Sequence, residues 1–362
     1  MKTIVQIVQH LQPGGIETMA LDLHHFFAHK GDKSYIISLE GDAETALENW
    51  PRLQAHRSQI LFLGKPDKFS PAFLLRLIGV LRKIKPSVLH THHIGPLLYG
   101  GLASRVLGIK VQVHTEHDAW HLENPRHRRL QRWLLRICRP RLVADADSVG
   151  QALRQYLNLN QLTVIRNGID TSRFVTGDAR RAREAFGLPQ DIKLLGCSGR
   201  LEIIKGQRLL IESLLDLPVS VHVVLAGSGS CEDVLREQAA ALGVASRVHF
   251  LGRVDDMPSF YQALDFFCLP SYKEGMPLSP LEAQACGIPS IVTDVGGARE
   301  SLCRDTGTLI PAGSSNDIVN AVDRLLNKTL AGSPRTFVTE NADIQHMAEA
   351  YYQLHYRGIP QE

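Results

Sequence analysis

The chain lacks any apolar run long enough to cross a membrane. Its 362 residues contain no stretch that approaches the roughly 20 consecutive apolar residues a spanning helix requires. The opening residues, MKTIVQIVQHLQPGGIE, carry glutamines inside their apolar stretch and no small-residue cleavage site after it. We interpret them as a first β-strand rather than a signal peptide. The Gly-x-Gly-x-x-Gly fingerprint of dinucleotide-binding enzymes is also missing, which disfavours a nicotinamide-dependent enzyme.

Paired cysteines are equally absent. The six cysteines are scattered, form no Cys-x-x-Cys pair, and several lie in apolar segments. We expect them to be buried thiols in the reducing cytoplasm. Aromatic residues are scarce, at 6% of the chain. No stacking platform therefore accompanies the basic segments, and nucleic-acid binding is not expected.

What the chain does have is an uneven distribution of charge. Residues 1–176 hold 23 Lys and Arg against 14 Asp and Glu, and the remaining residues hold 17 against 23. Twelve of the 16 histidines also lie in the first part. A basic half suits an anionic surface or an anionic acceptor. The alternative explanation is that the surface charges of two domains have drifted apart without a functional reason.

Short apolar, β-rich runs alternate with helical patterns, which predicts parallel sheets covered by helices on both faces. The expected strands span residues 3–8, 35–39, 60–63, 87–91, 111–115, 142–144 and 162–165, then 193–198, 220–226, 248–251, 266–269, 290–293 and 308–310. The polar segment 167–189 interrupts the pattern and is interpreted as a linker. The fold class is therefore α/β, with two Rossmann-like, doubly wound domains at 1–172 and 173–340 and a last helical segment at 341–362. Ligands are expected beyond the C-terminal ends of the strands, with the two domains facing each other across a cleft.

Two loops that follow expected strands have features of anion-binding sites. Gly14 and Gly15 precede a helix, and paired glycines let a ligand approach the backbone at a helix N-terminus. A tight strand-to-helix turn explains them equally well. Arg200 and Lys205 follow the strand at 193–198. The Arg200 guanidinium offers several N–H donors in one plane and the Lys205 ammonium a compact positive charge, and together they suit two phosphates. Solvated surface charge is the alternative for this pair.

Two carboxylates, Glu274 and Glu282, follow the strand at 266–269. Glu274 is expected in the loop after the strand, and Glu282 in the first turns of the next helix, whose amides would point at a phosphate. Carboxylates accept hydrogen bonds well from sugar hydroxyls. However, Ser279 and Glu282 also have the spacing of a capping box, with Pro280 at the first helical position. The sequence leaves both interpretations open.

Histidines and acids close two neighbouring strands of the first domain. The residues are His90, His92 and His93 on one strand, and His114, Glu116, His117 and Asp118 on the other. A histidine beside carboxylates at a strand end suits acid–base chemistry. Nothing fixes a third and a fourth metal ligand, so no metal site is expected. Asp145-Ala-Asp147 matches a metal-binding Asp-x-Asp string, but its place between a strand and a helix favours helix capping.

Taken together, these segments resemble the retaining glycosyltransferases of family 4 (glycosyltransferase group 1), which have the two-domain GT-B architecture. The resemblance covers nearly the whole chain. It runs in order through Gly14-Gly15-x-Glu17, Val164-Ile-Arg-Asn167-Gly168-Ile-Asp170, Gly199-Arg200 with Lys205-Gly206, Phe250-Leu-Gly252-Arg253-Val254, Glu274-x7-Glu282, Ala285-Cys-Gly287-Ile-Pro289, and Gly296-Gly297 with Glu300. One position departs from the pattern: Met276 stands where many relatives have Phe.

The resemblance implies a role for each of these residues. Arg200 and Lys205 would hold the donor diphosphate, Glu274 would contact the transferred sugar, and His117 would lie at the reacting centre; these four form the implied catalytic group. The implied donor contacts are Gly15, Arg200, Lys205, Arg253, Val254, Glu274, Gly275, Met276, Pro277, Leu278 and Glu282, the last accepting from the ribose hydroxyls. The first domain would bind the acceptor and the second the nucleotide sugar, and the last helix would cross back to the first domain. No cofactor and no metal are implied.

The segment between Glu123 and Asp145 contains seven arginines and no acid. They are Arg126, Arg128, Arg129, Arg132, Arg136, Arg139 and Arg141. Leu130, Trp133, Leu134 and Ile137 are expected to share one helical face, with Arg128, Arg132 and Arg139 on the opposite face. Such a helix suits docking to anionic lipid or to a lipid-diphosphate acceptor, with Arg128, Arg129, Arg132 and Arg136 as its candidate face. An ordinary sheet-covering helix with a solvated basic face is the alternative.

We therefore expect a hexosyltransferase that moves a hexose or N-acetylhexosamine from a UDP- or GDP-linked donor to a glycan or lipid-linked glycan. The family suggests bacterial surface-polysaccharide synthesis, in the cytoplasm or at the inner face of the cytoplasmic membrane. A sugar-nucleotide epimerase of the same fold and a non-catalytic sugar-nucleotide-binding protein are the alternatives. The intact set of Arg200, Lys205, Glu274 and Glu282 argues against the binding protein.

Overall fold

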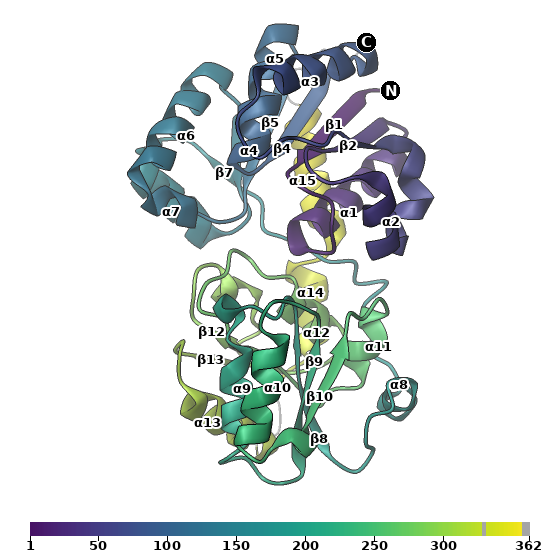
Figure 1. Ribbon diagram of the computed structural model, residues 1–362, viewed down its shortest axis with the longest axis vertical. Helices are drawn as coiled ribbons and strands as arrows, with labels where there is room; N and C mark the ends of the chain where they lie inside the picture. The colour runs from purple at the N-terminus through teal and green to yellow at the C-terminus, as the bar shows by residue number, and fades with distance from the viewer. Residues whose placement is uncertain (328–330, 357–362) are drawn as a thin grey trace. The chain divides into compact units, whose positions relative to one another are not determined.

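The computed structural model describes residues 1–327 and 331–356. The chain forms two compact units, Met1–Asn167 with Gln345–Glu362 (unit 1) and Gly168–Ile344 (unit 2). Each unit is a parallel sheet with helices packed around it (Figure 1). Within the two described ranges, no helix is both long and apolar enough to cross a bilayer.

Unit 1 contains a seven-stranded parallel sheet in the order β3-β2-β1-β4-β5-β6-β7. The strands are β1 Thr3–Val8, β2 Lys33–Ser38, β3 Ile60–Phe62, β4 Val88–His92, β5 Val111–Glu116, β6 Arg141–Ala144 and β7 Thr163–Val164. The α-helices are α1 Gly15–His29, α2 Ala43–Asn49, α3 Pro71–Ile84, α4 Ile94–Pro96, α5 Leu102–Leu107, α6 Pro125–Cys138 and α7 Asp147–Leu157. Two 3-10 helices, η1 Pro51–Gln59 and η3 Trp120–Glu123, and the π-helical segment η2 Leu97–Gly101 also belong to the unit. The direction of winding reverses between β1 and β4.

Unit 2 contains a six-stranded parallel sheet in the order β10-β9-β8-β11-β12-β13. The strands are β8 Lys193–Ser198, β9 Val221–Ala226, β10 Val248–Gly252, β11 Phe266–Leu269, β12 Ser290–Thr293 and β13 Thr308–Ile310. The helices are α8 Ala179–Ala185, α9 Gln207–Ser213, α10 Glu232–Ala241, α11 Met257–Gln262, α12 Ser279–Ala285, α13 Ser315–Asn327 and α14 Pro334–Asn341, with the short turns η4 Ile203–Lys205, η5 Ala245–Arg247 and η6 Ala298–Ser301. Winding reverses between β8 and β11, and ligands of doubly wound sheets bind at such a point.

The sequence explains where the longer helices start and which face they bury. Ser70 caps α3 by accepting a hydrogen bond from the Phe73 amide at 3.2 Å, and Pro71 occupies the first turn, where its missing N–H costs nothing. Phe73, Leu77 and Leu81 then recur on one face and are buried. The helix ends at Lys85, which adopts the left-handed conformation.

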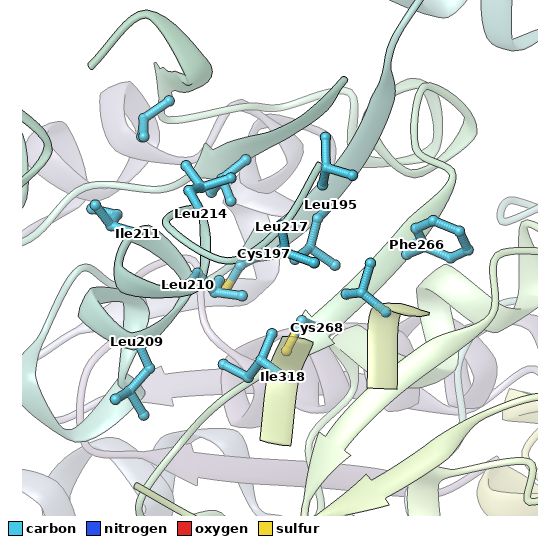
Figure 2. Close-up of a cluster of buried hydrophobic side chains, with 14 of the residues drawn as sticks. Leu195, Cys197, Leu209, Leu210, Ile211, Leu214, Leu217, Phe266, Cys268 and Ile318 are labelled. Carbon is cyan, nitrogen blue, oxygen red and sulfur yellow. The ribbon is translucent and has the colours of Figure 1, made fainter. Parts of the chain in front are cut away.

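The core of unit 2 fills the space between its sheet and the covering helices. Figure 2 shows Leu195, Cys197 and Cys268 from the strands packing against Leu210 and Ile318 from α9 and α13. Each leucine buried there contributes about 1.5–3 kcal/mol relative to an exposed one. This apolar layer holds β8 and β11 in place, and the loops after these two strands carry Arg200, Lys205 and Glu274.

The last helix, α15 Ile344–Tyr356, packs within unit 1 although it follows unit 2 in the chain (Figure 1). Tyr351 and Thr115 share a hydrogen bond of 3.1 Å between their hydroxyls. The ring of His355 lies 5.0 Å from that of Phe27, centroid to centroid. Residues far apart in the sequence therefore complete one core.

All 13 expected strands are present, each within two residues of its expected bounds, so the prediction of two doubly wound α/β domains is confirmed. Strands buried on both faces read as apolar runs, which is why they were recognisable. The segment expected to be a linker, 167–189, instead contains α8. Its Arg183 is buried and donates to the Ala263 carbonyl at 2.9 Å and to Asp265 at 2.6 Å. A charged residue there is part of the packing of unit 2.

Candidate functional site

The main candidate site lies in unit 2 where β8 and β11 end. The loop after β8 begins at Gly199 and contains Arg200, which is exposed, and then the half-buried Lys205. The side chain of Gln207 donates to the Arg200 carbonyl at 2.9 Å and so holds the loop in shape. Both cations predicted from the sequence therefore follow the strand at the point where winding reverses.

Glu274 lies in the loop after β11 and is buried, with 6% of its surface exposed. Its Oε1 accepts hydrogen bonds from Lys205 Nζ at 2.7 Å and from the Ser271 hydroxyl at 2.6 Å. The structure thus brings together Lys205 and Glu274, which are 69 residues apart in the chain. The sequence analysis did not identify Ser271 as a candidate site residue, although a polar residue directly after a buried strand is a reason to expect one.

Two glycines allow neighbouring loops to touch the Glu274 loop through the main chain. Gly206 adopts a φ of +70°, and a Cβ added there would overlap the Pro270 carbonyl. Gly296 adopts a φ of +52°, and a Cβ there would overlap the carbonyl of Glu274 itself. The Gly297 amide also donates to the Gly275 carbonyl at 2.9 Å. The loop is therefore fixed on both sides by backbone contacts that a side chain would break.

Glu282 lies in the first turn of α12, as expected, but it forms no capping box. The helix begins at Ser279, and its N-cap residue is Leu278, which makes no side-chain capping hydrogen bond. The Glu282 carboxylate instead accepts a hydrogen bond from the Tyr261 hydroxyl at 2.6 Å. The capping interpretation is wrong because the carboxylate points to a buried phenol. Sequence reasoning missed Tyr261, which resembles an ordinary core aromatic.

The remaining predicted donor contacts lie on adjacent loops. The loops after β8, β9 and β10 are joined by backbone hydrogen bonds, Gly199 N to Ala226 O at 2.9 Å and Gly227 N to Gly252 O at 2.7 Å. Arg253, which is exposed, and Val254 come directly after Gly252. On the other side, Gly275, Met276, Pro277 and Leu278 connect Glu274 to α12, and Met276 and Leu278 are buried.

In unit 1, His117 lies just beyond β5 and is buried inside the unit. Its Nε2 lies 3.1 Å from Nδ1 of His92, and its Nδ1 lies 3.3 Å from Asp145 Oδ2. Gln6 donates to the Ala20 carbonyl, and its own carbonyl oxygen lies 3.3 Å from His92 Nε2. Burial lowers the pKa of His117 to about 3. Both ring nitrogens of His117 are therefore engaged inside the unit.

The other histidines and acids of this region form a second buried cluster. Nε2 of His114 lies 2.7 Å from Glu116, and Gln131 donates to the same carboxylate. Burial lowers the pKa of His121, but Asp118, Glu116 and Gln131 outweigh burial and raise it to about 9. Across residues 1–327 and 331–356, no three His, Cys, Asp or Glu side chains are grouped so that they could hold a metal ion.

The helix-capping interpretation of Asp145-Ala-Asp147 concerns α7. The N-cap residue of this helix is Ala146, which makes no side-chain capping hydrogen bond, and Asp147 is the first helical residue and forms an ion pair with Arg166. Asp145 accepts from Asn167 at 3.0 Å beside His117. At the other expected loop of unit 1, Gly15 is exposed and is the first residue of α1.

The basic helix α6 presents a different face from the expected one. It buries Gln131, Leu134 and Cys138, whereas Trp133 and Ile137 are 49% and 37% exposed. Gln131 takes the buried position because it bonds to Glu116 and, at 2.5 Å, to His121. The outer surface, which we call the basic face, consists of Arg126, Arg129, Arg132, Trp133, Arg136 and Ile137. Arg128 stacks over the ring of Tyr156 instead, with its guanidinium carbon 5.5 Å from the centroid.

Comparison with known proteins places both halves of the chain in one family. The profile of glycosyl transferases group 1 matches residues 178–343, and that of glycosyltransferase family 4 matches residues 13–173. The D-inositol 3-phosphate glycosyltransferase of Mycobacterium tuberculosis is 34% identical over 222 residues, which is 58% of this chain. The match spans only 45% of that relative.

Solved structures share the fold across the chain. HepE of Anabaena, crystallised with UDP and glucose, has a TM-score of 0.84 at 21% identity, covering 98% of this chain and 99% of HepE. WaaG, a glycosyltransferase involved in lipopolysaccharide biosynthesis, has a TM-score of 0.75 at 17% identity, covering 98% of this chain and all of WaaG. These likenesses establish the GT-B fold, and the two profile matches show that the chain belongs to the group 1 glycosyltransferases of family 4 type.

Proposed function

We propose that the protein is a retaining hexosyltransferase that uses a UDP- or GDP-linked hexose or N-acetylhexosamine. The observation that carries this proposal is the pairing of Lys205 with Glu274 where β8 and β11 end, with Arg200 on the same loop as Lys205. This is where a doubly wound sheet binds its ligand, and the charges match those of a nucleotide sugar. HepE was crystallised with UDP-glucose, which supports UDP as the first nucleotide to test.

Arg200 and Lys205 would stabilise the diphosphate as it leaves. A cation about 4 Å from a phosphate oxygen contributes about 4 kcal/mol at an effective dielectric of 20. Glu274 is already bonded to Lys205 and Ser271, so it is not presented as a nucleophile. We therefore assign it to the hydroxyls of the transferred sugar. This arrangement supports a same-face displacement through an oxocarbenium-like transition state, without a covalent intermediate.

The acceptor would be a glycan or a lipid-linked glycan bound by unit 1, in bacterial surface-polysaccharide synthesis. Support comes from the basic character of residues 1–176 and from the likeness to WaaG. The exposed Gly15 at the start of α1 offers backbone amides to an anionic group there. His117 would contribute through its main chain at the reacting centre.

The test is binding and slow hydrolysis across UDP-, GDP- and ADP-sugars, with Glu274→Ala as the control. We expect one preferred donor, cleaved without added metal, and loss of cleavage in the variant. Conversion of the donor to an isomeric sugar nucleotide without an acceptor would instead identify an epimerase. Binding of a donor with no cleavage, even with added acceptor glycans, would identify a binding protein. No binding to any donor would refute the phosphate and carboxylate assignments.

We further propose that the basic face of α6 attaches the protein to the inner face of the cytoplasmic membrane. Its arginines surround the exposed side chains of Trp133 and Ile137. Each arginine near an anionic surface contributes about 1 kcal/mol, and an aromatic side chain suits the headgroup region. Flotation with phosphatidylglycerol vesicles should be lost in Arg129→Ala/Trp133→Ala/Arg136→Ala. It should be kept in Arg180→Ala/Arg181→Ala, a control on α8; flotation independent of anionic lipid would refute the attachment.

A further inference from the structure

Tyr261 is a buried tyrosine of unit 2 whose hydroxyl lies at the end of β8. It lies on α11, none of its surface is exposed, and its ring packs against Phe260 and Phe267 at centroid distances of 5.3 and 5.7 Å. Its hydroxyl has two partners, Glu282 Oε2 at 2.6 Å and Ser198 Oγ at 2.9 Å. The ring is explained by packing, whereas the hydroxyl joins two polar residues of the candidate site.

The direction of these two hydrogen bonds follows from the chemistry of the groups. A carboxylate only accepts, so the Tyr261 hydroxyl donates to Glu282. The phenol oxygen then accepts from the Ser198 hydroxyl. Burial and the charge of Glu282 raise the pKa of Tyr261 well above its ordinary value, so the proton stays on the phenol. The result is a one-way chain from Ser198 through Tyr261 to Glu282.

The ends of this chain are two segments to which we have assigned ligand contacts. Ser198 is the last residue of β8 and is followed by Gly199 and Arg200. Glu282 belongs to α12, which follows the Glu274 loop, and its side chain is only half-buried. Tyr261 therefore ties the carboxylate to the strand that carries the phosphate-binding loop, while a ligand can still reach Glu282.

We propose that Tyr261 is a positioning residue for nucleotide recognition, with Ser198 orienting its hydroxyl. By holding one oxygen of Glu282, the phenol fixes the rotamer in which that carboxylate accepts from the ribose hydroxyls. The ordering of a flexible glutamate side chain then precedes binding, which strengthens the ribose contact. This inference rests on the proposed function, because it presupposes a nucleoside diphosphate at the end of β8.

The test compares UDP, GDP and ADP with their 2′,3′-dideoxy forms by calorimetry. The proteins are wild type, Tyr261→Phe and Ser198→Ala, with Tyr351→Phe as control. Tyr351 is an equally buried tyrosine of unit 1 with a bonded hydroxyl. Wild type should bind the ribose form at least about tenfold more tightly than the dideoxy form. In Tyr261→Phe this preference should fall to about twofold, because the hydrogen bond that orients the Glu282 carboxylate is lost. The affinity for the dideoxy form should not change, because that form has no ribose hydroxyls for Glu282 to accept from.

Ser198→Ala should reduce the ribose preference by a smaller factor, and Tyr351→Phe should leave it unchanged. Thermal melting tests whether each variant is folded. If Tyr261→Phe does not fold, the ribose preference of Ser198→Ala still tests the inference. A Tyr261→Phe protein that keeps the full preference, or that loses affinity equally for both forms, overturns the positioning role. If wild type binds a nucleoside diphosphate without any ribose preference, the inference alone is wrong. If wild type binds none, the proposed function is wrong as well.

Discussion

Replacing Glu274 by glutamine should move nucleotide affinity and turnover in opposite directions. Lys205 Nζ lies 2.7 Å from Glu274 Oε1, and the two side chains are 22% and 7% exposed. At an effective dielectric of 20, the direct attraction at this distance is about 6 kcal/mol. Solvent around the lysine and the desolvation of both groups reduce the net value to about 1.5–3 kcal/mol, as for other hydrogen bonds between charged groups.

Under the proposed function, a diphosphate would compete with this carboxylate for Lys205. Glutamine keeps the shape of the side chain and its hydrogen bond to the amine but removes the negative charge. We therefore expect UDP or GDP, whichever wild type prefers, to bind about tenfold more tightly to Glu274→Gln, and the gain should shrink with salt. Transfer should fall by about 10²–10³, because the neutral amide no longer stabilises the sugar in the transition state.

The assay pairs calorimetry of the nucleoside diphosphate at about 50 and 500 mM salt with detection of diphosphate released during turnover. Glu237→Gln is the matched control, since Glu237 is an exposed glutamate on α10 of the same unit. It also removes one charge, yet should change neither quantity more than about twofold, as expected for an exposed charge. Weaker nucleotide binding in Glu274→Gln, or an equal gain in Glu237→Gln, would refute the competition.

Three further predictions concern stability and the shape of the loops. Gly296→Ala should abolish donor binding and lower the free energy of unfolding by more than about 2 kcal/mol, since a Cβ would displace the Glu274 carbonyl. Gly187→Ala is the control: its φ is also positive, at +62°, but the space around it is open, so it should lower the free energy of unfolding by only about 1 kcal/mol. The pKa of His121 is about 9 in the folded protein, above its unfolded value of 6.5, so its contribution to stability is complete below pH 6.5 and is lost as pH rises through 9. Denaturant titrations across this pH range should show a loss of about 1–2 kcal/mol in the free energy of unfolding after solvent screening. A His121→Gln protein whose stability falls equally with pH would contradict this assignment. Leu210→Ala should cost 2–5 kcal/mol by the same titration, and a loss below 1 kcal/mol would mean that the core around it collapses to fill the space.

The sequence was sufficient for the architecture because strand burial leaves a local signal. Each buried parallel strand is an apolar run, and polar residues directly after such a run lie at the ligand-binding edge of the sheet. The order of elements along the chain is therefore enough to predict that Arg200, Lys205 and Glu274 follow strands at this edge of the second sheet.

Side-chain partners were not predictable, because they depend on residues distant in the chain. Glu282 has the spacing of a capping box, but its partner is Tyr261, which the sequence presents as one more aromatic between two strands. On α6, the period of 3.6 residues placed Trp133 with the apolar face. The structure buries Gln131 on that helix instead, since Glu116 and His121 satisfy its amide.

The backbone contacts at Gly206 and Gly296 separate two tasks within one site. They hold the Glu274 loop in register through carbonyl oxygens, whatever side chains the loop carries. Substitutions at Met276 or Pro277 are therefore expected to change the segment that we assign to the donor sugar without moving the loop that carries Lys205. For engineering, this divides the site into a fixed backbone frame and a segment whose side chains can be exchanged. A library that keeps both glycines and randomises those two positions samples new donor sugars on a constant scaffold.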